Sequence, residues 1–137
     1  MNLSGKRVLL VEDNYLNAEI ATLMLKEKDI LVSLAENGKA GAEAFAASAP
    51  GAFDAILMDI RMPVMNGYEA TRAIRSMDRP AAKTIPILAM TADAFEEDLR
   101  RAKDAGMDDY LTKPVDANRV YAALSKAFQD RPAKSPA

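Results

Sequence analysis

Carboxylates follow two apolar runs of the sequence at the point where each run stops. Residues 6–11 lead into Glu12 and Asp13, and residues 55–58 lead into Asp59. A carboxylate in such a place can act as a nucleophile or as a ligand of a hard metal ion. Asp59 is the strongest candidate for the working residue, because the apolar run before it is typical of a buried parallel strand.

Two further apolar runs end at groups that suit a phosphate ligand. Residues 85–90 lead into Thr91, and residues 109–112 lead into Lys113. Ligands of open α/β sheets bind outside the carboxyl ends of the strands, so we expect the side chains after all four runs to meet at one edge. Converging carboxylates repel one another unless a cation lies among them, and Mg²⁺ meets this need. A lysine and a hydroxyl at the same edge complete a binding site for a phosphoryl group.

Strands and helices must alternate to place these side chains. Apolar runs alternate five times with segments of helical periodicity, at the spacing of βαβ units. This order predicts an α/β domain whose parallel sheet has right-handed crossovers and helices on both faces. The expected strands are 6–11, 30–35, 55–59, 85–90 and 109–112, and the expected helices are 14–28, 39–48, 67–77, 94–105 and 117–128.

The helical patterns also predict which side chains face the core. The helix 67–77 is expected to turn Arg75 toward water, and residues 79–83 are expected to form a loop. Helix 14–28 has four apolar residues at helical spacing, which form its expected core stripe: Leu16, Ile20, Leu23 and Met24.

Composition excludes several kinds of chemistry. The 137 residues contain no cysteine and no histidine, which rules out disulfides, thiolate nucleophiles, Ser-His-Asp catalysis, His-ligated metals and a phosphohistidine in this sequence. The net charge of -2 argues against a broad basic surface for nucleic acid. No apolar run approaches the length of a membrane span and no signal-peptide pattern is present, so a cytoplasmic location is expected.

Four segments of this sequence resemble the receiver domain of two-component response regulators. They read VLLVEDN at 8–14, ILMDIRMPVMNG at 56–67, MTA at 90–92 and GMDDYLTKP at 106–114. The resemblance covers about residues 6–128 and is strongest to receiver domains of hybrid sensor histidine kinases. It implies a flavodoxin-like (βα)5 fold with strand order 2-1-3-4-5, in which residues 1–128 form the receiver domain and 129–137 a flexible tail or linker.

The resemblance also implies a role for each candidate residue. Asp59 is the expected phosphoacceptor, which forms an acyl phosphate. Asp13 and Asp59 are expected to bind Mg²⁺ through their carboxylates, Arg61 through its backbone carbonyl, and Glu12 through a water ligand of the ion.

Further implied roles concern the phosphoryl group and the switch. Lys113 is expected to pair with a phosphoryl oxygen, and Thr91 to donate a hydrogen bond to the phosphorylated form. Tyr110 is the expected switch aromatic, which fills the space that Thr91 vacates. The Lys113–Pro114 bond is expected to be cis, the form that only X-Pro bonds adopt cheaply.

The implied function is that of a phosphoacceptor switch and not of an enzyme. The expected phosphodonor is a histidine kinase or a histidine phosphotransfer protein, and the isolated domain is expected to be monomeric, without membrane insertion. The candidate docking residues for the donor are Leu16, Ile20, Pro114 and Val115. Phe95 is a candidate contact for other partners.

One pair near the site is a separate hypothesis. Arg61 and Asp93 each lie two residues after a site residue and are expected to approach each other across the mouth of the site. Such an exposed pair would add little stability but would slow the entry of water. Two solvated side chains are an equally good interpretation.

Three alternatives remain beside this interpretation. A haloacid-dehalogenase-type phosphatase also uses an aspartate nucleophile and Mg²⁺. That family requires a second aspartate two residues after the nucleophile, where this sequence has Arg61. A flavodoxin-like cofactor binder needs a phosphate-cradling loop, whereas the loop after Val11 is acidic. A degenerate receiver would bind partners without phosphorylation, which the complete set of candidate residues disfavours.

Overall fold

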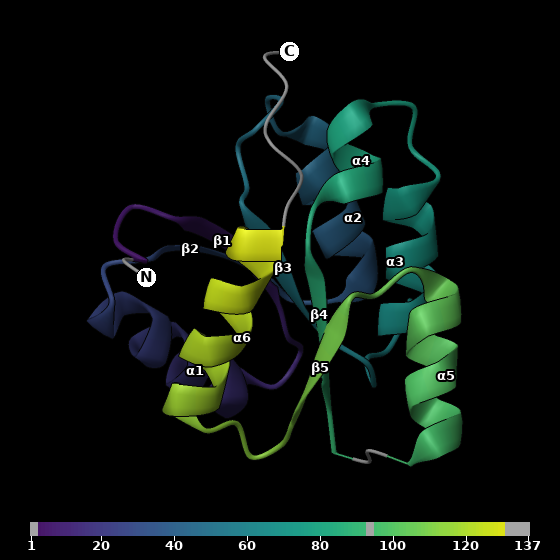
Figure 1. The fold of residues 1–137 in the computed structure, drawn as a ribbon. Coiled ribbons are helices and arrows are strands. Elements are labelled where there is room, and N and C mark those ends of the chain that lie inside the picture. Colours follow the sequence, from purple (N-terminus) through teal and green to yellow (C-terminus); the bar gives the residue numbers. More distant parts are fainter. Residues whose placement is uncertain (1–2, 93–94, 131–137) are drawn as a thin grey trace.

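A parallel sheet of five strands lies between two layers of helices in the computed structural model, which describes residues 3–92 and 95–130 (Figure 1). The strands are β1 Arg7–Val11, β2 Leu31–Ala35, β3 Ala55–Asp59, β4 Ile87–Thr91 and β5 Asp109–Thr112. The helices are α1 Tyr15–Glu27, α2 Gly38–Ala47, α3 Gly67–Arg75, α4 Pro80–Thr84, α5 Glu96–Ala105 and α6 Ala117–Asp130.

The strand order is β2-β1-β3-β4-β5, which confirms the expected topology. Successive residues of β1 alternate between two cores: Leu9 and Val11 pack on the side of α2, α3 and α5, while Val8 and Leu10 pack on the side of α1 and α6. A strand covered on both faces needs an apolar residue at almost every position. That requirement explains the continuous apolar runs in the sequence.

The core stripe expected for α1 was wrong at three of its four residues; only Met24 packs against the core, partly buried. Leu16, Ile20 and Leu23 are 62%, 42% and 62% exposed, and the buried residues are instead Ala18, Ala21 and Leu25. Alanines let the helix axis approach the sheet closely, and Leu25 fills the space at the far end. Leu16, Ile20 and Leu23 therefore form an outward apolar stripe of α1.

The expected loop at residues 79–83 was also wrong, because residues 80–84 form the short helix α4. Pro80 begins it, at a position where a missing N–H costs nothing. At the other end of the chain, α6 reaches Asp130, two residues beyond the expected end of the last helix. The rest of the expected tail, residues 131–137, lies outside the described residues.

Arg75 points inward, contrary to its expected exposure. Its guanidinium donates hydrogen bonds to the carbonyl oxygens of Gly106, at 3.0 Å, and Ala82, at 3.1 Å, and to the carboxylate of Asp108, at 2.9 Å. Gly106 and Asp108 follow α5, and Ala82 belongs to α4. One side chain of α3 therefore connects this helix to both of these segments. Helical periodicity alone does not reveal these distant acceptors.

Replacing Arg75 with alanine is expected to lower the free energy of unfolding by about 2–3 kcal/mol, because two carbonyls and one carboxylate lose a charged donor. Urea unfolding followed by circular dichroism measures this change. Arg72→Ala, on the exposed face of the same helix, is the matched control and should change stability by less than about 0.5 kcal/mol. Equal losses in the two variants would contradict the bridging role.

Candidate functional site

The register of the sheet brings four strand ends together at one edge. Val11 pairs with Met58, Asp59 with Met90, and Thr91 with Thr112. Glu12 directly follows β1 and Lys113 directly follows β5, so both residues lie at this edge. The structure thus places the four strand-end groups side by side, as the sequence predicted.

Three carboxylates form the centre of this edge. Oxygen atoms of Glu12, Asp13 and Asp59 all lie within 4.8 Å of one another. Glu12 and Asp59 are buried, while Asp13 is exposed and opens the cluster to solvent. A set of hard oxygen donors at this separation is the donor set that Mg²⁺ prefers. The residues present therefore fit a divalent cation.

Lys113 compensates part of this negative charge. Its Nζ lies 2.9 Å from Asp59 Oδ1 and 3.2 Å from Glu12 Oε2. Its backbone N–H donates to the carbonyl oxygen of Thr91, and the Lys113–Pro114 peptide bond is cis. Burial of the ammonium opposes its charge, but the hydrogen bond and the charge of Asp59, together with Glu12, outweigh burial and raise the pKa of Lys113.

The ionised form of Asp59 is destabilised in the folded protein. Burial raises the pKa of Asp59 from its ordinary value of 3.8 to about 7; the hydrogen bond from Lys113 opposes this rise, and the negative charge of Glu12 adds to it. The cost of the ionised form decreases when positive charge is added nearby. The site is therefore arranged to gain from binding a cation next to this carboxylate.

Thr91 and Tyr110 border one small cavity below α5. Thr91 is buried, whereas Tyr110 is 41% exposed. The cavity has a volume of about 10 Å³, which is at the lower limit for a single water molecule. A tyrosine ring does not fit into this space unless neighbouring atoms, such as those of Thr91, move first.

The loop after β3 carries Arg61 and a tight turn. Arg61 is exposed and lines a pocket beside the acidic cluster. Val64 has a φ of 70°, and the N–H of Met65 donates to the carbonyl oxygen of Pro63 across it at 2.7 Å. The partner expected for the Arg61 side chain, Asp93, lies outside the described residues.

A groove of about 290 Å³ leads from the acidic cluster along α1. Glu12 and Lys113 line its inner end, while Ile20, Pro114 and Val115 line its apolar walls. Three of the four expected docking residues thus lie on one surface. The fourth, Leu16, is exposed one turn before Ile20 on α1.

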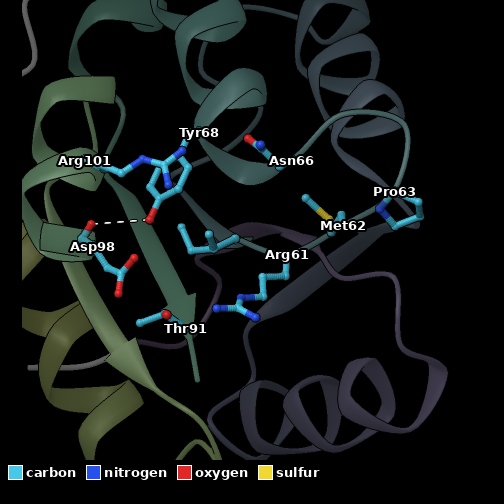
Figure 2. A pocket seen from close by; sticks show the side chains of 9 residues that line it. Arg61, Met62, Pro63, Asn66, Tyr68, Thr91, Asp98 and Arg101 are labelled. Carbon is cyan, nitrogen blue, oxygen red and sulfur yellow. Dashed lines mark hydrogen bonds between the residues drawn. The ribbon is translucent and has the colours of Figure 1, made fainter. Parts of the chain in front are cut away.

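Sequence reasoning did not single out Tyr68, Asp98 and Arg101. The hydroxyl of Tyr68 donates to the carbonyl oxygen of Asp98 at 3.4 Å, and the guanidinium of Arg101 lies 4.4 Å from the centre of the Tyr68 ring. Asp98 and Arg101 follow Tyr68 by 30 and 33 positions, and no local pattern connects them to it. Figure 2 shows them around the pocket that Arg61 also lines.

Within residues 3–92 and 95–130, no helix combines the length and the apolar character needed to cross a lipid bilayer.

Comparison with known proteins places the site in context. The family model described as "Response regulator receiver domain" matches residues 8–125. A rice protein (Oryza sativa subsp. japonica) named "Probable histidine kinase 6" is 36% identical over 140 residues; the match covers 90% of this chain and 14% of that protein. The chain therefore spans a small part of the length of this relative.

Two solved structures are also similar to this chain. The receiver domain of a sensor histidine kinase from Pseudomonas aeruginosa, with magnesium ion coordinated in the active site cleft, has a TM-score of 0.83 and 35% identity, and the match covers 93% of this chain and all of that one. The receiver domain of Saccharomyces cerevisiae Ssk1, crystallised with the histidine phosphotransfer protein Ypd1, has a TM-score of 0.80 and 29% identity. The match covers 93% of this chain and 91% of that one.

Proposed function

This chain belongs to the response regulator receiver domain family, and from that membership we propose that it accepts a phosphoryl group from a phosphohistidine onto Asp59. Receiver domains are signal-transduction modules of two-component phosphorelays, typically switches and not catalytic enzymes. The donor histidine must lie outside these 137 residues, which contain none. The observation that carries the proposal is the contact of Asp59 with Lys113 inside the acidic cluster.

The chemistry is one in-line displacement. A carboxylate oxygen of Asp59 attacks the phosphorus atom, and the bond from phosphorus to the ring nitrogen breaks with its electron pair returning to that nitrogen. Such transfers depend mainly on positioning and on neutralising charge. The Lys113 ammonium, already 2.9 Å from Asp59 Oδ1, is placed to follow the phosphoryl oxygens as negative charge arrives.

The acidic cluster is the proposed metal site. Asp13 and Asp59 would hold Mg²⁺ through their carboxylates, Arg61 through its backbone carbonyl, and Glu12 through a water ligand. When bound, the ion supplies positive charge that neutralises the transferring group. The donor set of the three carboxylates supports this assignment, as does the magnesium ion in the related receiver from Pseudomonas aeruginosa.

Thr91 and Tyr110 are the proposed reporters of phosphorylation. The Thr91 hydroxyl would donate to the new phosphoryl group and move toward it. Because both residues border the small cavity below α5, this movement would open space for the half-exposed ring of Tyr110. A charge added at Asp59 would thereby change the surface formed by α5 and β5.

The groove along α1 is the proposed docking surface for the phosphodonor. It joins exposed apolar residues of α1 to Pro114 and Val115, and its inner end reaches Lys113. Apolar surface next to a reacting group suits a histidine-bearing helix that must be positioned closely. The complex of the yeast receiver with a histidine phosphotransfer protein supports a partner of this kind.

A beryllofluoride titration tests the proposed site. With Mg²⁺ present, amide shifts should change around Asp59, Thr91 and Lys113, and acetyl phosphate should add one phosphoryl group by mass. Lys113→Ala is expected to slow adduct formation by about 100-fold, because it removes one electrostatic contact to the transferring group. Lys126→Ala, an exposed lysine of α6, is the charge-matched control. A wild-type protein that forms no Mg²⁺-dependent adduct would refute the proposed function.

A further inference from the structure

A second pocket lies beside the acidic cluster, between α3 and α5 (Figure 2). Its volume is about 470 Å³. The loop after β3, the first turn of α3 and the middle of α5 contribute its lining. Apart from Arg61 and Thr91, the proposed phosphoryl chemistry assigns no role to these side chains, so the pocket needs an explanation of its own.

Hydrogen-bond donors from three parts of the chain line this pocket: Arg61, Asn66, Tyr68 and Arg101 (Figure 2). The side-chain oxygen of Asn66 accepts from the N–H of Glu69 at 2.9 Å, so the free end of this side chain is its amide NH₂ group. A concentration of donors suits a ligand that only accepts hydrogen bonds.

Arg101 is held in position by stacking. Its guanidinium carbon lies 4.4 Å from the centre of the ring of Tyr68, and that ring is buried. A stacked guanidinium keeps its in-plane N–H groups available, and this planar fork binds carboxylates in a bidentate manner. The Tyr68 hydroxyl makes only a long hydrogen bond of 3.4 Å to Asp98, so a closer acceptor can replace it.

We propose that this pocket binds the carboxylate side chain of an acidic segment in a protein partner. Among the described residues that line it, two carry positive charge and Asp98 alone carries a carboxylate. Ile60, Met62 and Pro63 provide apolar surface for the methylene groups that lead to such a carboxylate. The positive charge and the apolar surface together suit a glutamate or aspartate side chain.

A protein side chain fits this pocket better than a free metabolite. Sites for small molecules enclose most of the ligand surface. Here Arg61 and Arg101 are both exposed, so the rim of the pocket stays open to solvent. A larger partner surface can cover this rim while it delivers one acidic side chain. Binding of this kind does not depend on transfer of a phosphoryl group to Asp59.

The test uses two capped tetrapeptides, one with the sequence Leu-Glu-Glu-Leu and a neutral one with glutamine in place of glutamate, in buffer freed of metals by a chelating resin. Amide chemical shifts of the whole chain report binding. The acidic peptide is expected to cause saturable shifts at residues 60–68 and 98–101, in the wild type and equally in Asp59→Asn. The neutral peptide is expected to cause none.

Three variants identify the pocket residues. Arg101→Ala should weaken binding of the acidic peptide by about tenfold, because a charged hydrogen-bond donor is lost. Arg100→Ala removes the same charge from an exposed neighbour that does not line the pocket, and should change affinity by less than about twofold. Asp98→Asn should strengthen binding, because it removes the opposing carboxylate.

The outcomes separate this inference from the proposed function. Unchanged affinity in Arg101→Ala, or equal losses in the Arg100 and Arg101 variants, would refute the proposal that the acidic side chain binds in this pocket. A changed affinity in Asp59→Asn, in either direction, would place the peptide at the acidic cluster and would also refute it. Free glutarate that binds as tightly as the peptide would overturn the assignment to a protein partner. None of these results depends on whether Asp59 can be phosphorylated.

Discussion

Replacing Asp59 with asparagine is expected to abolish the phosphoryl adduct and, in metal-free buffer at pH 8, to stabilise the fold by about 1–2 kcal/mol. The first effect follows because the amide oxygen is too weak a nucleophile to form an acyl phosphate. The second follows because the carboxylate is buried beside Glu12. Function and stability therefore make opposite demands on this position.

The sign of the stability effect follows from the pKa of Asp59. Because this pKa is raised from 3.8 to about 7, the folded protein binds a proton more tightly than the unfolded chain does. Stability therefore falls as the pH rises from about 4 to about 7, and it stays at the lower level above that range. The asparagine variant lacks this titration. Solvent screening and the lost contact with Lys113 reduce the gain below the full value of the shift.

Thermal unfolding from pH 4 to pH 9 measures the effect. The wild-type curve should lose stability across this window, the Asp59→Asn curve should be flatter, and Mg²⁺ added at pH 8 should stabilise the wild type more than the variant. Asp78→Asn, at an exposed aspartate, is the control for a general change of net charge. An Asp59→Asn protein less stable than the wild type at pH 8 would contradict this account.

The position of the site was predictable from sequence because it depends on strand ends alone. Continuous apolar runs identify buried parallel strands, and parallel strands present their carboxyl ends at one edge. Glu12, Asp59, Thr91 and Lys113 each follow such a run. The contact between Lys113 and both carboxylates is a finer result, because it depends on side-chain geometry that a sequence pattern does not contain.

The orientation of α1 was not predictable in the same way. Its sequence offers two possible stripes, a large one with Leu16, Ile20 and Leu23 and a small one with Ala18 and Ala21. Periodicity favours the more apolar stripe, but close packing on the sheet selects the smaller one. The error is informative, because a helix that leaves its large apolar residues in water has surface available for a partner.

Long-range polar contacts were likewise hidden from the sequence. Arg75 was expected in water because helical periodicity places it on the outward face of the helix, yet its acceptors lie on other elements. The stacking of Arg101 on Tyr68 joins α5 to α3 in a similar way. Both arginines belong to pairs that only the folded chain brings together, and for that reason the pocket between α3 and α5 emerged from the structure alone.

Replacing Gly67 with alanine is expected to cost about 3–5 kcal/mol of stability and to damage the site at the same time. A Cβ atom at this position would lie 2.3 Å from the carbonyl oxygen of Asp59 and 2.9 Å from the Cα of Ile60. Both are backbone atoms, so no flexible side chain can move aside. The N–H of Gly67 also donates to the carbonyl oxygen of Ile60 at 2.9 Å, and the displacement would strain this bond.

Urea unfolding of Gly67→Ala and of the control Gly51→Ala separates crowding from backbone freedom. Gly51 has a φ of 76° and nothing within 4 Å of an added Cβ, so its substitution should cost only about 1 kcal/mol through the left-handed backbone. At Gly67 the loss of stability has a different cause, because an added Cβ would collide with the backbone at the end of β3. Since that end carries Asp59, the Gly67 variant should also bind beryllofluoride more weakly where it remains folded, while the Gly51 variant should bind it normally. Equal costs in the two variants would show that α3 does not need this close approach to position the phosphoacceptor.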